Sequence, residues 1–106
     1  MFPFFILAYL KRLSATDEKD LIGRIGRRES DALTLLYDLY GDTLYGFILA
    51  MVKKQAEAED LLQELFVQIW DKAKLFDAGR GNVYTWLVTL ARNRTIDHIR
   101  SKQFRL

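Results

Sequence analysis

Apolar residues recur at three- and four-residue intervals along most of this chain, and this periodicity restricts the possible folds more than any other feature. The clearest run lies between residues 57 and 74, where pairs of apolar side chains return every four residues. Such spacing lines them up along one face of an α-helix, which is then stable only when that face is buried against other elements. The apolar stripe consists of Leu61, Leu62, Leu65, Phe66, Ile69 and Trp70.

The same periodicity predicts helices over most of the remaining chain. No alternating strand pattern and no internal repeat occur, so we expect an all-α fold: a compact helical bundle of about four helices, with the long helices antiparallel. A polar connector at 53–58 and a loop at 76–82 with two glycines are expected to separate the later helices. The expected helices cover residues 17–27, 31–52, 57–74 and 83–102.

Capping and glycine signals refine these bounds. Ser14 or Thr16 is the expected N-cap of the first helix, and Ser30 or Asp31 that of the second, because short oxygen-bearing side chains accept from the free N–H groups there. Two glycines, Gly41 and Gly46, fall inside the second helix and weaken it. They predict either close packing or a local break.

Residues 1–13 do not fit the pattern of the rest. The apolar run at 2–10 is far shorter than the roughly 20 residues that span a bilayer, and the basic pair Lys11 and Arg12 follows it rather than precedes it as in a secretory signal. We therefore treat 1–13 as an apolar extension and 14–106 as the domain. Three interpretations of the extension stay open: a helix packed on the domain, a disordered tail, and a start codon assigned too far upstream.

The composition argues against catalysis and against a bound cofactor. The 106 residues contain no cysteine and one histidine, His98, which excludes thiolate metal sites and clusters of histidine ligands. No glycine-rich phosphate loop occurs, because Gly79–Arg80–Gly81 is too short to form one. We expect no enzyme activity, no metal, no cofactor and no small-molecule substrate.

The charge is distributed unevenly. Residues 73–106 contain seven basic and two acidic side chains, although the whole chain has a formal net charge of only +2. This end of the chain can attract a polyanion. Tyr84 and Trp86 precede the arginines Arg92, Arg94 and Arg100, and aromatic rings among arginines suit unstacked bases and a sugar-phosphate backbone. The loop before them offers Asp77 and Asn82 as polar groups that could line a small pocket.

A second candidate surface is the polar face of the helix expected at 57–74. Asp60, Glu64 and Gln68 follow one another every four residues, with Gln63 and Asp71 beside them. This ridge of carboxylates and amides is either an ordinary solvated helix face or a docking surface for arginines of a partner protein. Pattern alone favours the solvated face.

Taken in order, four segments resemble region 2 of bacterial RNA polymerase sigma factors of the sigma-70 superfamily, in the extracytoplasmic-function (ECF) branch. The resemblance extends over residues 17–102, and residues 1–13 have no counterpart in it. Each segment is a weak signal alone, but their order and spacing together are specific. They are Ala58-Glu59-Asp60-Leu61-Leu62-Gln63-Glu64-Leu65-Phe66, Ile69-Trp70, Tyr84-Thr85-Trp86-Leu87, and the run from Leu90 to Arg100.

The resemblance implies two binding roles. It implies that the acidic helix docks on the clamp coiled coil of the polymerase β′ subunit, and that the following loop and helix open the promoter minus-ten element and hold its non-template strand. A flipped base would then lie in a pocket formed by residues 76–82. For Trp86 and Asp97 we expect packing and helix–helix hydrogen bonding first. The implied docking residues are Asp60, Gln63, Glu64, Phe66 and Trp70; the candidate DNA-binding residues are Asp77, Arg80, Asn82, Tyr84, Arg92, Asn93, Arg94 and Arg100.

The predicted function is therefore that of a non-enzymatic, cytoplasmic adaptor for promoter recognition. Its expected partners are core RNA polymerase and the single non-template strand of promoter DNA, with an anti-sigma factor as a further one. Family members normally continue into a second domain that reads the minus-thirty-five element, whereas this sequence ends at Leu106. We therefore expect an isolated domain, a truncated product, or a protein that relies on another chain for promoter choice. The main alternative is a helical protein-interaction module without nucleic-acid function, and a general double-stranded DNA binder is a more distant one.

Overall fold

The computed structural model describes residues 15–104, and in this part of the chain all regular secondary structure is helical. The predicted all-α bundle is confirmed, and no helix bound differs from the expected one by more than two residues. Two short 3₁₀ helices, η1 and η2, lie between the last two α-helices. The elements are α2 (Ala15–Gly26), α3 (Ser30–Val52), α4 (Gln55–Lys72), η1 (Ala73–Leu75), η2 (Ala78–Arg80) and α5 (Val83–Phe104).

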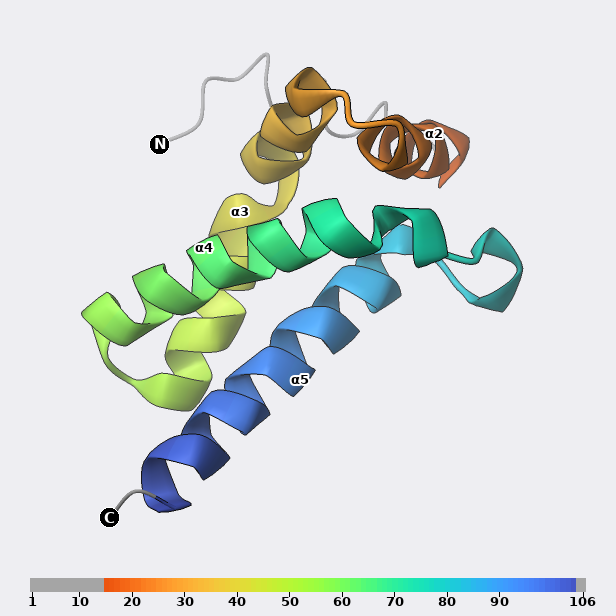
Figure 1. Cartoon of the computed structure of the whole chain (residues 1–106). Helices are drawn as coiled ribbons and strands as arrows, with labels where there is room; N and C mark the ends of the chain where they lie inside the picture. Colours follow the sequence, from red (N-terminus) through yellow and green to blue (C-terminus); the bar gives the residue numbers. More distant parts are fainter. Residues whose placement is uncertain (1–14, 105–106) are drawn as a thin grey trace.

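The three long helices pack on one another and α2 crosses one end of them (Figure 1). Helices α4 and α5 run in opposite directions, so the start of α4 lies beside the end of α5. The apolar stripe of α4 faces inward as predicted, with Leu61, Leu65 and Ile69 at most 2% exposed. Burial of such side chains is the main force that holds the helices together.

Helix α3 supplies much of the core through Leu36, Leu44 and Ile48, each at most 1% exposed. Among the described residues it is the one helix that is long and apolar enough to cross a membrane, with a mean hydropathy of 1.2. Of that apolar window 22% is buried, and the partly buried Leu35, Leu39 and Phe47 also pack on the core, so core packing accounts for part of this hydropathy.

The capping predictions for α3 were wrong. The N-cap position is Glu29, whose side chain forms no capping hydrogen bond, and Ser30 is already the first helical residue. Thr16 lies inside α2, while Ser14 is outside the described residues, as is the apolar extension at 1–13.

Both glycines are accommodated without a break in α3. Gly41 is buried under the ring of Tyr37, where an added Cβ would be 3.4 Å from the nearest ring carbon. Gly46 is exposed, with no atom within 4 Å of the corresponding position. Close packing against Tyr37 therefore explains why position 41 is a glycine, whereas no packing contact explains the glycine at position 46.

Candidate functional site

The solvent-facing side of α4 presents only part of the predicted ridge, because Gln68 is half-buried and its Oε1 atom is buried without a hydrogen-bond partner among the described residues. Asp60 is exposed there, and so are Gln63 and Glu64, which follow it by about one helical turn. Val67 lies on the same face one turn further along and is 62% exposed, so an apolar side chain extends the polar ridge. We call Asp60, Gln63, Glu64 and Val67 the α4 face.

Phe66 and Trp70, which the resemblance grouped with the docking residues, lie elsewhere on the helix. Phe66 is only 7% exposed and packs edge-to-face on Tyr37, with ring centroids 5.0 Å apart. Trp70 is half-buried beneath Arg28, whose guanidinium carbon is 5.1 Å from the ring centroid. Arg28 Nη1 also donates a 2.7 Å hydrogen bond to the carbonyl of Trp70. Both aromatic rings hold α4 in place, and a partner on the α4 face would contact little of Phe66.

The loop between α4 and α5 is shaped by its own polar side chains. Asp77 is the N-cap of η2: its carboxylate accepts a 2.9 Å hydrogen bond from the Gly79 N–H and lies 3.5 Å from Arg80 Nε. At the other end, Asn82 Oδ1 accepts a 2.8 Å hydrogen bond from the Thr85 N–H at the start of α5. These contacts leave the Arg80 guanidinium and the Asn82 amide N–H groups exposed to solvent.

A hollow of about 270 Å³ lies between this loop and the first turns of α5, where the pocket was predicted. Its wall includes Trp86, which is half-buried as expected and packs edge-to-face on Phe76 with ring centroids 5.3 Å apart. We call it the loop hollow. It brings together Phe76, Asp77, Arg80, Asn82, Thr85 and Trp86.

Beyond the loop hollow, the outward side of α5 continues the candidate DNA-binding surface. Arg92, Asn93 and Arg100 are exposed; Asn93 and Arg100, seven residues apart, nearly coincide in rotation about the helix, and Arg92 is turned by about 80° from Arg100. None of the three makes a side-chain hydrogen bond or ion pair with another described residue. Their donors are free to meet phosphates.

Arg94 points instead toward α4. Its Nη2 is 4.0 Å from Oε1 of Glu64, and its buried Nε atom has no hydrogen-bond partner in the described part of the chain. The structure therefore pairs one candidate DNA-binding residue with one candidate docking residue. The expected role of Asp97 in helix–helix hydrogen bonding was wrong, because its exposed carboxylate forms no hydrogen bond or ion pair with another residue in the range 15–104.

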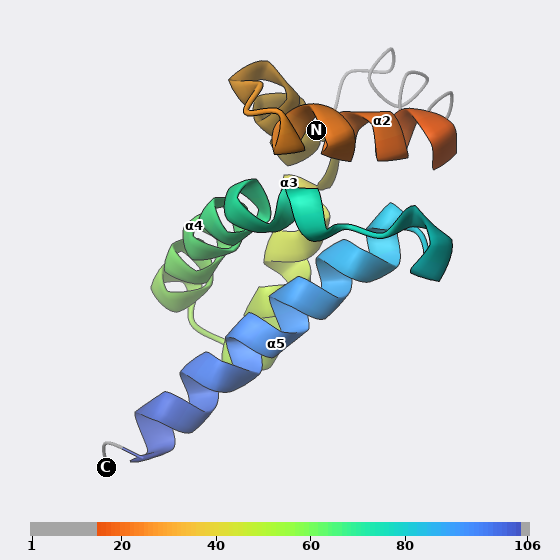
Figure 2. The same cartoon turned by 45° about the vertical axis from the view of Figure 1, so that its right-hand side comes forward.

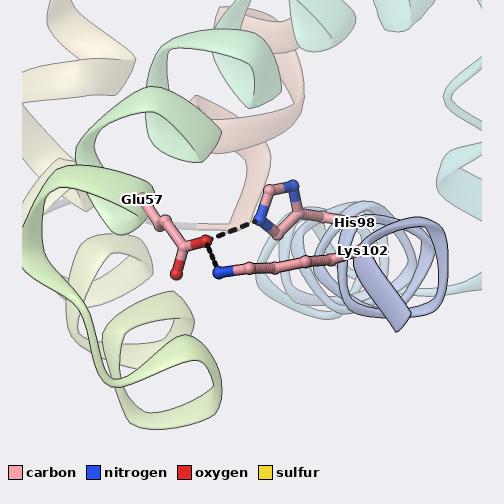
Figure 3. Close-up of polar contacts among 3 residues, drawn as sticks. All are labelled: Glu57, His98 and Lys102. Atoms are coloured by element: carbon pink, nitrogen blue, oxygen red, sulfur yellow. Dashed lines mark hydrogen bonds and ion pairs between the residues drawn. The ribbon is translucent and has the colours of Figure 1, made fainter. Parts of the chain in front are cut away.

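A cluster that sequence reasoning missed links the start of α4 to the end of α5 (Figure 3). Glu57 Oε1 accepts a 2.5 Å hydrogen bond from Lys102 Nζ and lies 3.4 Å from His98 Nε2. The hydrogen bond from Lys102, with a smaller contribution from His98, lowers the pKa of Glu57, and the same bond raises the pKa of Lys102. The spacing of His98 and Lys102 by four residues was the available signal, but the partner helix was not predictable.

A cavity of about 520 Å³ between the two helices extends from this cluster to the Glu64–Arg94 pair. It contains carboxylates from both helices and basic side chains from α5, so its charges largely compensate one another. This arrangement fits a helix–helix contact better than a site for a small ion.

Tyr84 is 48% exposed at the start of α5, and its ring centroid is 6.3 Å from that of Tyr40 on α3. The Tyr40 hydroxyl donates a hydrogen bond to the carboxylate of Glu18 on α2. Burial and this carboxylate together raise the pKa of Tyr40. The exposed Tyr84 ring thus lies against Tyr40 of α3, which is itself hydrogen-bonded to α2.

The sequence of this chain is similar to those of known proteins. The family model described as Sigma-70 region 2 matches residues 36–105. The ECF RNA polymerase sigma factor SigK of Mycobacterium ulcerans is 31% identical over 87 residues, which are 82% of this chain and 46% of the relative. The ECF RNA polymerase sigma factor BldN of Streptomyces coelicolor is 40% identical over 87 residues, 82% of this chain and 33% of the relative. This chain therefore spans half the length of these relatives or less.

Proposed function

This chain belongs to the ECF branch of the sigma-70 family, and from that premise we propose that it is an adaptor for transcription initiation that uses two separate surfaces. The α4 face docks on the β′ clamp coiled coil of core RNA polymerase. The loop hollow and the outward side of α5 bind the non-template strand of the minus-ten element. No covalent step is assigned to the chain, and its proposed place of action is the bacterial cytoplasm.

The observation that carries the DNA-binding role is the continuity of the loop hollow with the outward side of α5. The hollow offers aromatic walls and polar groups to one unstacked base, and Tyr84 offers an exposed ring beside it. Arg92 and Arg100 follow along α5 with guanidinium groups that pair with no other described residue. Stacking on aromatic rings together with a line of cations is the usual way in which proteins hold a single strand.

The free energy needed to open the promoter would then come from the contacts between the chain and the single strand. Extraction of a base from a duplex requires a few kcal/mol, which contacts in a fitting pocket can return. Asp77 and Asn82 stabilise the loop before DNA arrives, so less conformational entropy is lost on binding. This pre-formed loop favours capture of a flipped base over non-specific association along duplex DNA.

The docking role is supported by the exposure and chemistry of the α4 face. Its carboxylates can pair with basic side chains of a partner helix, and Val67 adds an apolar contact at one end. Carboxylate–arginine pairs fix the register of such interfaces. Phe66 and Trp70 support the face from behind through Tyr37 and Arg28.

The decisive experiment measures the affinity of the chain for bacterial core RNA polymerase. The double substitution Asp60→Asn/Glu64→Gln should weaken binding about tenfold or more, which is about 1.4 kcal/mol. Asp38→Asn/Asp42→Asn, which removes the same charge from exposed positions of α3, is the matched control and should bind like the unsubstituted chain. Equal affinity of both double variants would reject the docking role. Polymerase binding without any binding of single-stranded DNA would favour the alternative, an interaction module without nucleic-acid function.

A further inference from the structure

We propose that a second hollow, on the other side of Phe76 from the loop hollow, binds a backbone phosphate of the same single strand. This inference rests on the proposed function, because it extends the path of the strand bound by the loop and α5. The proposal places α2 in the nucleic-acid interface, although none of the binding residues predicted from the sequence lies in this helix.

Helix α2 passes over η1 (Figure 2), and the second hollow is lined by residues of both. Its volume is about 390 Å³. Lys19, Gly23 and Arg27 line it from α2 and the residue that follows this helix, while Lys74 and Phe76 line it from the segment after α4. We call it the basic hollow.

The charge of its lining points to an anion. Three basic side chains and no acidic one occur among the described residues that line it. Arg27 is partly neutralised, because its Nε is 3.4 Å from a carboxylate oxygen of Glu29. Lys19 and Lys74 are exposed and form no ion pair within residues 15–104. Their two ammonium groups therefore supply the uncompensated charge.

Two glycines give the basic hollow its form. Gly26 is buried against Lys74, where an added Cβ would be 3.4 Å from Cγ and 3.6 Å from the backbone nitrogen of Lys74. Its small size allows α2 to lie close to η1, which brings Lys74 beside the helix. Gly23 is exposed and lines the hollow without a side chain, and the Arg27 guanidinium lies close over it, with Nη1 3.6 Å from the position that an added Cβ would take.

Phe76 connects the two hollows, since it lines both. Lys74 and Asp77, one on each side of it, are three residues apart and therefore separated by at most about 11 Å of extended chain. Neighbouring phosphates along a single strand are several ångströms apart. A strand whose base enters the loop hollow thus has its next phosphates within reach of Lys19 and Lys74.

Fluorescence anisotropy with labelled, mixed-sequence single-stranded DNA of about 12 nucleotides tests this inference. Lys19→Gln/Lys74→Gln should lower the affinity and reduce the slope of log K against log salt by about 0.7 for each phosphate that is no longer bound. Lys53→Gln/Lys54→Gln removes the same charge from the connector between α3 and α4 and is the matched control. It should leave the salt slope unchanged.

A second measurement does not depend on charge removal from the protein. Single methylphosphonate linkages, which are neutral, are placed at successive positions of the oligonucleotide. A neutral linkage at one or two neighbouring positions should lower the affinity of the unsubstituted chain for the oligonucleotide. The same linkage should not lower the affinity of Lys19→Gln/Lys74→Gln any further. Gly23→Leu should weaken binding in the same way as the double lysine variant, because the added side chain enters the basic hollow while the net charge stays constant.

Three outcomes would overturn the inference. One is an unchanged salt slope for Lys19→Gln/Lys74→Gln while Arg92→Gln/Arg100→Gln still weakens binding, which would leave the proposed function intact. Another is a drop in polymerase affinity of the lysine variant with DNA binding unchanged, which would make the basic hollow a protein-binding surface. The third is no DNA binding by the unsubstituted chain, which would reject the proposed DNA-binding function as well.

Discussion

Glu57 in the first turn of α4 accepts a 2.5 Å hydrogen bond from Lys102, which lies 45 residues later in the last turns of α5. His98, one turn before Lys102, lies 3.4 Å from the same carboxylate oxygen. The contact joins two helix ends that no loop connects, because the loop between these helices is at their opposite ends. It therefore holds the C-terminal half of α5 against the helix that carries the proposed docking face.

The contribution of this contact to stability should depend on pH at both extremes. The lowered pKa of Glu57 gives stability that is present above about pH 4.3, its ordinary value, and is lost as the pH falls through the folded-state pKa. The raised pKa of Lys102 gives stability that is present below about pH 10.5, its ordinary value, and is lost as the pH rises through the folded-state pKa. Glu57→Gln should thus lower Tm by a few degrees at most between about pH 5 and pH 10, and this difference should fall toward zero as the pH drops through the folded-state pKa of Glu57 or rises through that of Lys102.

Thermal unfolding followed by circular dichroism over this range measures the effect as a difference between variants. Glu59→Gln, an exposed neighbour on α4, is the matched control and should leave the Tm profile unchanged. A constant difference between Glu57→Gln and the unsubstituted chain at every pH would show that the ionic contact contributes nothing.

A substitution at Tyr40 should show how much the hydrogen bond between α3 and α2 contributes to stability. Tyr40→Phe removes the hydroxyl that donates to Glu18 and should destabilise the fold by about 1–3 kcal/mol, since the bond has a charged acceptor and is half-buried. In a spectroscopic titration of tyrosine ionisation, the unsubstituted chain should contain one tyrosine that ionises later than an ordinary phenol, because the pKa of Tyr40 is raised. Loss of that late component in Tyr40→Phe would identify it, and an unchanged titration curve would contradict the hydrogen bond.

The sequence was sufficient to predict the helices and most of the exposed candidate residues, because both follow from periodicity within one segment. It was insufficient wherever the answer depended on which helix faces which. Phe66 could be placed on the inward stripe but not against Tyr37, and Arg94 could be counted as basic but not paired with Glu64. The Glu57 cluster and the basic hollow could not be predicted either, because each is formed by residues from two elements that meet only when the helices pack. The Glu29 N-cap was missed because its side chain makes no capping bond.

Phe66 tests whether a residue in the docking motif acts through packing. Phe66→Ala should destabilise the fold by about 3–5 kcal/mol, because it removes a buried ring and its contact with Tyr37. Phe66→Leu fills much of the same space and should retain polymerase affinity at temperatures where the protein is folded. Chemical denaturation and polymerase binding of both variants separate the two roles. A large decrease in affinity in a fully folded Phe66→Leu variant would show that the ring contacts the polymerase directly.

Two glycines should respond in opposite ways to alanine. Gly46 lies inside α3 with open space around it, so Gly46→Ala should stabilise the fold by about 0.5–1 kcal/mol. Gly81 has a φ of +155° in the loop, a conformation that side-chain-bearing residues rarely adopt. Gly81→Ala should destabilise the protein and also weaken single-strand binding, because Gly81 lines the loop hollow. Denaturation curves of both variants check the difference in sign, and equal effects would contradict the assigned backbone conformations.

The arginines of α5 should differ in their effect on DNA binding although they lie within nine residues of one another. Arg92 and Arg100 are exposed and unpaired in the described part of the chain, so Arg92→Gln/Arg100→Gln should weaken single-strand binding and reduce the salt slope by about 1.4. Arg94 is half-buried and faces Glu64, so Arg94→Gln should change the slope little. Its removal should instead affect the α4 face, because Glu64 would no longer have a basic neighbour on α5.

Anisotropy titrations at several salt concentrations, with polymerase binding measured in parallel, distinguish the two cases. An equal slope change for Arg94→Gln and for either exposed arginine alone would mean that the strand reaches the α4 side of α5, which would require a path different from the one proposed.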